Sequence, residues 1–508
     1  MAISHLKENL ERIGSEGFFD DLKISRGIER ESLRIGTDKK ISNKSHPASL
    51  GSSLCSDEIT TDFAEALLEL VTPTFDSRNE LYKYLYDLHH FVNTKIGDEV
   101  LWNFSMPCAF ASANEIRLAE YGTSNQGKIK NIYRRGLKER YGSIMQCVSG
   151  IHYNFSLSQL SLERLLTALP SKQDKNELYL GAIRNIKRMA PFLLAFFGAS
   201  PVCHNSYLFG RSHNLMPKGD DLYLPNATSL RMSKIGYQSP VQEELHISYN
   251  DLNSFIDALV YGITTPHPLF TKIGLLDKDG YPQQISDGIL QIENELYDIV
   301  RPKRKGNKLD RPVELLKNKG ISYLEIRGID INPFDPAGIS ESQIALLDAF
   351  LLLCLIKESE KTSNKELQEN IHNQELVVGF GRDPNLKISS RGQSVLLKDQ
   401  FAMLKDELLM VSDYVKDNDL ANAVQNHFEN PFISERVLEI ATNREFTDVA
   451  YEHSIKIKDS FQKDYEDKNG FEKRAAKSID IFKVLGAGDE TDIKEFVNLY
   501  NDKIKEMR

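Results

Sequence analysis

The chain has 508 residues, of which 27% are charged and 41% hydrophobic, and 63 Lys and Arg against 73 Asp and Glu give a net charge of −10 at pH 7. This composition excludes disordered, collagen-like and low-complexity classes, and the acidic balance argues against a nucleic-acid partner, which would need a basic face. At roughly 150 residues per domain the length allows about three domain-equivalents, or one large enzyme domain with insertions.

The N-terminal residues 1–14 mix charged and apolar side chains at helical spacing and lack the uninterrupted apolar stretch of a signal peptide. The two most apolar windows, 189–203 and 344–356, are shorter than the roughly 18 to 20 residues that a membrane span needs. Five cysteines form no Cys-x-x-Cys pair, and an odd number suits a reducing compartment. We therefore expect a cytoplasmic protein with no membrane segment.

Four segments alternate with period 2, which assigns successive side chains to opposite faces of a β-strand. They are 27–35, 66–71, 148–157 and 321–331. In the first, Glu29 and Glu31 share a face that is otherwise apolar. In the second, Glu69 lies between two apolar residues on one face, and Asp62 lies a few residues upstream.

A basic stretch follows at 128–140, with six Lys and Arg in thirteen residues. In an acidic protein such a stretch is either a solvated helix surface or a local positive field that could hold a triphosphate. The residues just before it, 122–128, have the spacing of a P-loop. Ile129 occupies the position where Ser or Thr should bind Mg²⁺, and no clear strand leads in, so we reject a P-loop.

The third and fourth strand segments also carry polar side chains where a plain core strand would have Val or Ile. In 148–157, His152 and Asn154 share one face and the apolar residues occupy the other. In 321–331, Glu325 and Arg327 alternate with apolar neighbours. Each of the four strands is therefore expected to present an ionisable group.

The rest of the chain is expected to be mainly helical. Residues 302–312 and 361–384 are turn-rich and charged, which is typical of surface loops. Apolar residues at three- and four-residue spacing predict exposed amphipathic helices over 342–358, 398–416 and 448–477. We expect a region of mixed strands and helices over residues 1–350, and a mainly helical section over 351–508 packed on the same unit.

Acidic side chains on mostly apolar strands must pair with a cation, become protonated or bind a metal ion. If the four strands are neighbours, their side chains form an oxygen-rich cluster with one imidazole, made of Glu29, Glu31, Asp62, Glu69, His152 and Glu325. Hard oxygen ligands suit Mg²⁺ or Mn²⁺ better than Zn²⁺, and such ions usually accompany nucleotide phosphates. For any one of these residues alone, an exposed or salt-bridged side chain is the simpler interpretation.

Longer motifs give the chain a specific resemblance. Among them are Gly27-Ile28-Glu29-Arg30-Glu31 and Gly150-Ile151-His152-Tyr153-Asn154-Phe155-Ser156, and the others lie at 61–63, 69–73, 101–107, 141–142, 229–233, 236–237, 291–297, 325–327 and 330–334. With these motifs in this order, the sequence closely resembles the proteobacterial type of glutamate–cysteine ligase. The resemblance covers residues 27 to about 340.

The resemblance implies an α+β, glutamine-synthetase-like catalytic fold, with a curved, mostly antiparallel sheet that forms a funnel and is backed by helices. It also implies an ATP- and Mg²⁺-dependent ligase, with Mn²⁺ as an alternative ion. Such an enzyme phosphorylates the γ-carboxylate of L-glutamate, and the amine of L-cysteine then attacks the acyl phosphate. The products are γ-glutamylcysteine, ADP and phosphate, in the first step toward glutathione. By analogy we expect a monomer and feedback inhibition by glutathione.

Position by position, the resemblance implies a role for each matching residue. The metal ligands or their near neighbours would be Glu29, Glu31, Asp62, Glu69, His152 and Glu325. Arg231 would hold glutamate, and Arg134 and Arg327 would face the phosphates. The cysteine pocket would be shaped by Phe63, Leu137, Gln146, Tyr237 and Tyr297.

Two alternatives stay open, and a third is disfavoured. The enzyme could join glutamate to an amine other than cysteine, or the chain could be a catalytically silent nucleotide or amino-acid sensor with a structural metal site. A bifunctional enzyme that also completes glutathione is disfavoured, because the length leaves no room for a second ATP-dependent catalytic domain.

Overall fold

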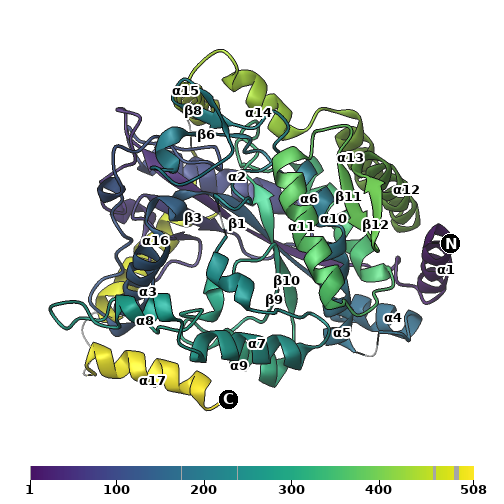
Figure 1. Ribbon diagram of the computed structural model, residues 1–508, viewed down its shortest axis with the longest axis horizontal. Helices are drawn as coiled ribbons and strands as arrows, with labels where there is room; N and C mark the ends of the chain where they lie inside the picture. The colour runs from purple at the N-terminus through teal and green to yellow at the C-terminus, as the bar shows by residue number, and fades with distance from the viewer. Residues whose placement is uncertain (1, 173, 237, 462–464, 486–490, 508) are drawn as a thin grey trace.

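The fold is built around one antiparallel sheet (Figure 1). The computed structural model describes residues 2–172, 174–236, 238–461, 465–485 and 491–507. The main sheet has the strand order β2-β3-β1-β5-β10-β9, with β4 paired to β1, and every one of these pairs is antiparallel. Its strands are β1 (Ile24–Ile35), β2 (Ile59–Thr61), β3 (Leu67–Val71), β4 (Val100–Leu101), β5 (Gly150–Leu157), β9 (Val300–Lys303) and β10 (Tyr323–Asp330).

The register of this sheet brings together the four strands that the alternation predicts. Glu31 of β1 lies opposite Glu69 of β3, and Glu29 of β1 lies opposite His152 of β5. On the other side of β5, Glu325 of β10 lies opposite Asn154. The condition for a shared carboxylate cluster, that the four strands are neighbours, is therefore met.

The other face of the sheet is covered by helices. Ile151, Tyr153 and Phe155 of β5 point away from His152 and enter the main hydrophobic core. At the centre of that core lies α10 (Glu341–Ile356), whose side chains are buried from Gln343 to its end. A capping box, in which the Ser340 and Gln343 side chains each bond the other residue's backbone N–H, begins this helix. Burial of one sheet face leaves the opposite, polar face free to form a site.

Helices and two small sheets complete the molecule. The helices that precede α10 are α1 (Ala2–Ser15), α2 (Arg78–Lys95), α3 (Asn125–Tyr141), α4 (Gln159–Ala168), α5 (Lys175–Arg188), α6 (Ala190–Phe196), α7 (Leu252–Thr264), α8 (Pro268–Ile273) and α9 (Pro312–Lys319). Those that follow it are α11 (Asn364–Phe380), α12 (Leu397–Val415), α13 (Asn418–Glu429), α14 (Ile433–Ala441), α15 (Phe446–Ser460), α16 (Phe471–Leu485) and α17 (Ile493–Lys505). The small sheets contain β6 (Val202–His204), β7 (Met216–Lys218) and β8 (Asp221–Tyr223), and β11 (Lys387–Ser390) with β12 (Gln393–Leu396).

The predicted mixture of helices with a mostly antiparallel sheet and a helical C-terminal section is confirmed, but several local predictions need correction. Residues 361–384 are mostly helix α11 and not a loop, because Ser363 caps its start through the N–H of Glu366. The helix predicted over 342–358 exists but is buried rather than exposed. The helix predicted over 448–477 is two helices, α15 and α16.

All five cysteines are buried and free. Within the described residues no helix is both long and apolar enough to cross a membrane.

Packing on α10 leads to a prediction about acid stability. Burial lowers the pKa of His427 on α13, which packs against α10, from 6.5 to about 4. Between these pH values the unfolded chain binds a proton at His427 that the folded chain excludes. The free energy of unfolding therefore falls as the pH drops from about 6.5 to 4. Above pH 6.5 this histidine does not change the stability. His427→Gln should reduce this fall by up to about 3 kcal/mol, measured by urea unfolding at several pH values. His5→Gln on the exposed side of α1 is the control, and an equal effect of both substitutions would contradict the assignment.

Candidate active site

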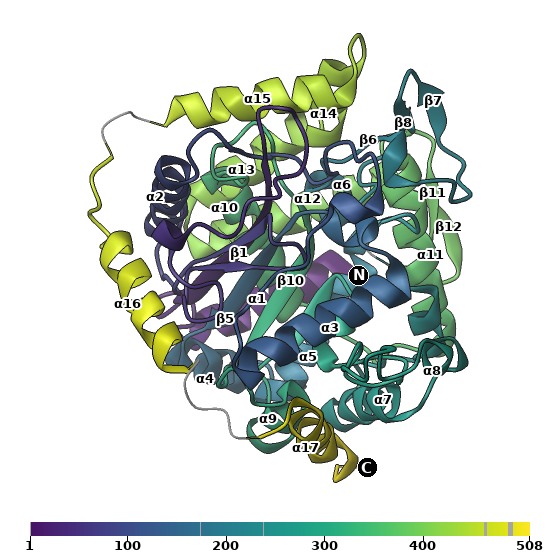
Figure 2. The same cartoon turned by 90° about the vertical axis from the view of Figure 1, so that its left-hand side faces the viewer.

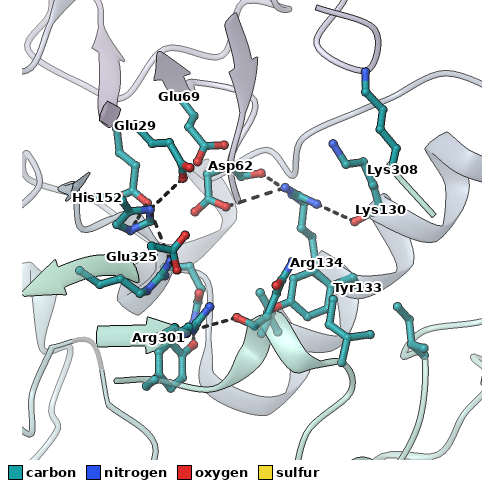
Figure 3. Close-up of a pocket in the computed structure, with 18 of the residues that line it drawn as sticks. Glu29, Asp62, Glu69, Lys130, Tyr133, Arg134, His152, Arg301, Lys308 and Glu325 are labelled. Atoms are coloured by element: carbon teal, nitrogen blue, oxygen red, sulfur yellow. Dashed lines mark hydrogen bonds and ion pairs between the residues drawn. The ribbon is translucent and has the colours of Figure 1, made fainter. Parts of the chain in front are cut away.

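A cavity of about 300 Å³ lies between the polar face of the main sheet and α3. Figure 2 shows α3 crossing in front of the sheet, and Figure 3 shows the side chains that line the cavity. The sheet supplies carboxylate side chains, and α3 supplies cationic side chains. Ser124 caps α3 by accepting the N–H of Gly127, and the helix ends at Gly142, whose φ of 83° is open to glycine at little cost.

Two carboxylates and an imidazole form the tightest group of possible metal ligands among the described residues. One ligand atom from each of Glu29, His152 and Glu325 lies within 4.8 Å of the others. His152 Nδ1 is 3.1 Å from Glu29 Oε2, and Asn154 Nδ2 donates to the other Glu29 oxygen at 3.0 Å. Glu325 is almost fully buried and contacts Lys303 at 3.3 Å and Arg327 at 3.2 Å.

The remaining predicted ligands line the same cavity, next to this group. Glu31 accepts the backbone N–H of Gly150 at 2.7 Å and lies 3.8 Å from His152 Nε2. Asp62 lies 3.8 Å from the guanidinium of Arg134. All six predicted ligands are thus brought together, and Figure 3 shows Glu69 and Glu29 side by side above His152 and Glu325.

Ionisation of the acids differs across the cluster. Burial, followed by the charges of Glu29, Asp62 and Glu31, raises the pKa of Glu69 well above its ordinary value. Burial also opposes ionisation of Glu325, but Lys303, Arg327, His152 and Arg301 outweigh it and lower its pKa well below the ordinary value. Crowded buried carboxylates of this kind are relieved by a divalent cation. The oxygen-rich donor set therefore fits Mg²⁺ or Mn²⁺, with Glu29, His152 and Glu325 as its centre.

Basic side chains from α3 lie on the opposite side of the cavity. Arg134 donates to the backbone oxygen of Asp62 and, at 2.9 Å, to that of Lys130. Its guanidinium carbon also lies 4.7 Å from the centre of the Tyr121 ring. The basic stretch is therefore a helix with one face in the cavity, which supports the local positive field over the solvated surface.

Arg231 and Arg327 enter the cavity from other elements. Arg231 is 2% exposed, and it donates to Asp330 at 3.3 Å and to the backbone oxygen of Arg327 at 3.2 Å. Its guanidinium lies against Gly150, where an added Cβ would be only 1.8 Å from Nη2. Glycine at this strand position therefore makes room for the arginine.

Four of the five residues predicted for the cysteine pocket fall within the described residues. Leu137, Gln146 and Tyr297 line the cavity, and Gln146 Nε2 donates to the Tyr297 hydroxyl at 3.1 Å. Phe63 is not among the lining residues, and its side chain is 1% exposed and packs in the core. Tyr237 lies outside the described residues.

Several lining residues were missed by the sequence reasoning. The cationic ones are Lys130, Arg301, Lys303 and Lys308, and the apolar or aromatic ones include Ile129, Tyr133, Ile285, Ile292, Leu309 and Tyr500. Lys130 stood inside the basic stretch, and its position one helical turn before Arg134 could have identified it. Tyr500 belongs to α17, which no local motif connects to the site.

Comparisons with known proteins agree with this geometry. The family model described as glutamate-cysteine ligase matches residues 16–377. The chain is 45% identical over 373 residues to the glutamate–cysteine ligase of Saccharophagus degradans, which covers 72% of this chain and 70% of that protein. It is 38% identical over 493 residues to that of Alcanivorax borkumensis, covering 93% of this chain and 94% of that protein.

Solved structures are similar as well. A crystal structure of the glutamate–cysteine ligase of Francisella tularensis in complex with AMP superposes with a TM-score of 0.91 at 32% identity, over 96% of this chain and 99% of that one. A bifunctional glutathione synthetase from Pasteurella multocida gives a TM-score of 0.69 at 24% identity, over 97% of this chain and 59% of that one. This second likeness concerns the fold.

Proposed function

The chain belongs to the glutamate-cysteine ligase family, and we propose that its cavity joins the γ-carboxylate of L-glutamate to the amine of L-cysteine with cleavage of ATP to ADP and phosphate. The observation that carries the proposal is the division of the cavity into a carboxylate side on the sheet and a cationic side on α3. A cavity of this kind can hold a polyanion together with divalent cations. The reaction is the first step of glutathione biosynthesis.

The chemistry explains the charge pattern. A carboxylate is a poor electrophile, and phosphorylation by ATP turns it into an acyl phosphate that an amine can attack. Bringing ATP to glutamate crowds negative charges, which arginines counter by positioning and by electrostatic stabilisation. In this proposal Arg134 and Arg327 face the phosphates, and Arg231 holds a carboxylate of glutamate.

The substrate amine would be selected near Gln146 and Tyr297. Their mutual hydrogen bond fixes both side chains beside Leu137, which offers an apolar surface to the cysteine side chain. A different shape of this small pocket would select a different amine. The choice of cysteine as the acceptor amine therefore depends on the shape of this pocket.

We assign Mg²⁺ as the bound cation, with Mn²⁺ as its substitute, and Glu29, His152 and Glu325 as the residues that would hold it. When bound, such an ion neutralises phosphate charge and polarises phosphoryl oxygens. Glu31, Asp62 and Glu69 line the same region and would hold a further ion or its water shell.

Purified protein tests the proposal. With Mg-ATP, L-glutamate and L-cysteine, we expect γ-glutamylcysteine and phosphate in equal amounts, measured by mass spectrometry and a phosphate assay. α-Aminobutyrate, putrescine and ammonia replace cysteine in parallel reactions. Faster ligation of one of these amines would identify a different acceptor, and nucleotide binding without any turnover would favour the sensor.

The apolar end of the cavity leads to a second prediction. Ile129, Ile285 and Tyr500 line the cavity and pack in one apolar cluster, and we assign this end to the adenine base. Tyr500→Ala should raise the KM for ATP roughly 10-fold, because an aromatic face stacked on a base is lost, and should leave the KM for glutamate unchanged. Leu499→Ala, at an exposed neighbour on α17, is the control. Equal changes in both substrate constants would place the adenine elsewhere.

The same proposal includes the organisation of the chain. The catalytic region of residues 1–350 and the helical section of residues 351–508 would work as one unit, since Tyr500 of the second section lines the cavity. We assign the enzyme to the cytoplasm, where five buried free thiols stay reduced. By analogy with the family we assign a monomer. Glutathione shares its γ-glutamyl group with the product and would compete for the cavity.

A further inference from the structure

Lys130 reaches the cavity from α3 one turn before Arg134, so the two side chains leave the helix on the same face. Its ammonium lies 4.8 Å from the centre of the Tyr121 ring, the same ring that Arg134 contacts. Tyr121 is held in turn by its hydroxyl, which donates to the backbone oxygen of Thr61 at 2.7 Å. The buried ring therefore fixes two cations beside Asp62.

The cavity's other cations already have a polar partner. Arg134 pairs with Asp62, Arg231 with Asp330, and Lys303 and Arg327 with Glu325, while Arg301 donates to the backbone oxygen of Asn294 and Lys308 to that of Leu54. For the ammonium of Lys130 the described residues supply neither an ion pair nor a hydrogen bond, only the face of Tyr121. Figure 3 shows it across the cavity from His152 and Glu325.

The electrostatic setting of Lys130 favours an incoming anion. Burial, together with the charges of Arg134 and Lys308, outweighs the attraction of Glu69 and Asp62 and lowers the pKa of Lys130 to about 8. A phosphate group placed against the ammonium would offset both the burial and the cationic neighbours. A neutral or cationic ligand would not.

We propose that Lys130 binds the β- or γ-phosphate of ATP directly, from the side opposite the carboxylates that would hold the metal ions. The inference rests on the proposed function for the identity of the polyanion. In this assignment Lys130 contacts neither the α-phosphate nor the adenine nor the ribose, which are the parts that ATP shares with AMP. The ammonium would donate to non-bridging oxygens as negative charge moves onto the leaving ADP.

Equilibrium binding distinguishes this role from a structural one. Lys130→Met should weaken the binding of Mg-ATP roughly 10- to 100-fold, measured by calorimetry, because a charge-assisted hydrogen bond is lost. The affinity for AMP should stay within about twofold, since AMP lacks the β- and γ-phosphates. Lys130→Arg should recover part of the lost affinity. Lys138→Met, which removes an equal charge from an exposed position on the same helix, should leave both affinities unchanged.

Two results would overturn the proposal. One is unchanged Mg-ATP affinity in Lys130→Met, and the other is an equal loss of AMP and ATP affinity. Binding is measured without turnover, so a wild-type protein that binds ATP but makes no γ-glutamylcysteine would refute the proposed function and leave this test intact.

Acetylation of the wild-type protein covers the case in which the variants do not fold. After brief treatment with an acetylating reagent and peptide mapping, Mg-ATP should protect Lys130 several-fold more than AMP does, and neither nucleotide should protect Lys138. Equal protection of Lys130 by both nucleotides, or by neither, would also contradict the proposal.

Discussion

Glu325→Gln should lower kcat by about 1000-fold while the protein stays folded, because the side chain keeps its shape and loses the charge that faces Glu29 and His152. Glu325 is held ionised by Lys303 and Arg327 despite its burial. The amide oxygen can accept from only one of the two cations, which contact different oxygens of Glu325, so the thermal unfolding midpoint should fall by several degrees without loss of the fold. Steady-state kinetics and a thermal melt measure the two quantities.

Binding of Mn²⁺ gives this prediction a readout that does not depend on turnover. Electron paramagnetic resonance should show weaker Mn²⁺ binding to Glu325→Gln than to wild type. Glu314→Gln on the exposed side of α9 is the matched control and should change neither binding nor kcat. A less stable but fully active Glu325→Gln protein would mean that the carboxylate serves structure alone, as in the sensor alternative.

The carboxylate side of the site could be predicted from sequence, because successive side chains of a strand point to opposite faces. Alternation placed Glu29, Glu31 and His152 on one face of their strands, and a polar residue on a buried face is costly without a partner. The register of β1 with β3 and β5 then joined them as expected. What alternation cannot give is the order of the strands in the sheet, which the structure supplies.

The rest of the site depends on contacts distant in sequence. Tyr500 reaches the cavity because α17 packs against α3, and no periodicity within α17 reports that contact. Phe63 lies next to the predicted ligand Asp62, but its ring packs in the core, and the sequence does not report that direction. Helix α11 was predicted as a loop because it has many charged residues and only one narrow buried face, so its apolar periodicity is weak.

The burial of α10 also depends on contacts that are distant in sequence. Its apolar residues surround the helix on all sides apart from Asp348, which is fully buried and contacts Arg26 at 2.8 Å and the Tyr153 hydroxyl at 2.7 Å. A helix that is apolar all round belongs in a core. The exposure was predicted from three- and four-residue spacing, and the ion pair of Asp348 on the far side of the sheet could not be foreseen from that spacing.

Gly150→Ala should reduce kcat/KM for glutamate by roughly 100-fold or more, because the new methyl group would occupy the place of the Arg231 guanidinium. That guanidinium cannot yield easily, since it is buried and held by Asp330 and by the backbone oxygen of Arg327. Gly27→Ala on the adjacent strand is the matched control, because its Cβ would meet its nearest neighbour at an ordinary 3.7 Å. If Arg231 holds glutamate as proposed, Gly150→Ala should impair glutamate binding far more than ATP binding, in isothermal titrations of each substrate. Equal losses for the two substrates would instead indicate a general collapse of the sheet, and unchanged glutamate binding would remove Arg231 from the glutamate site.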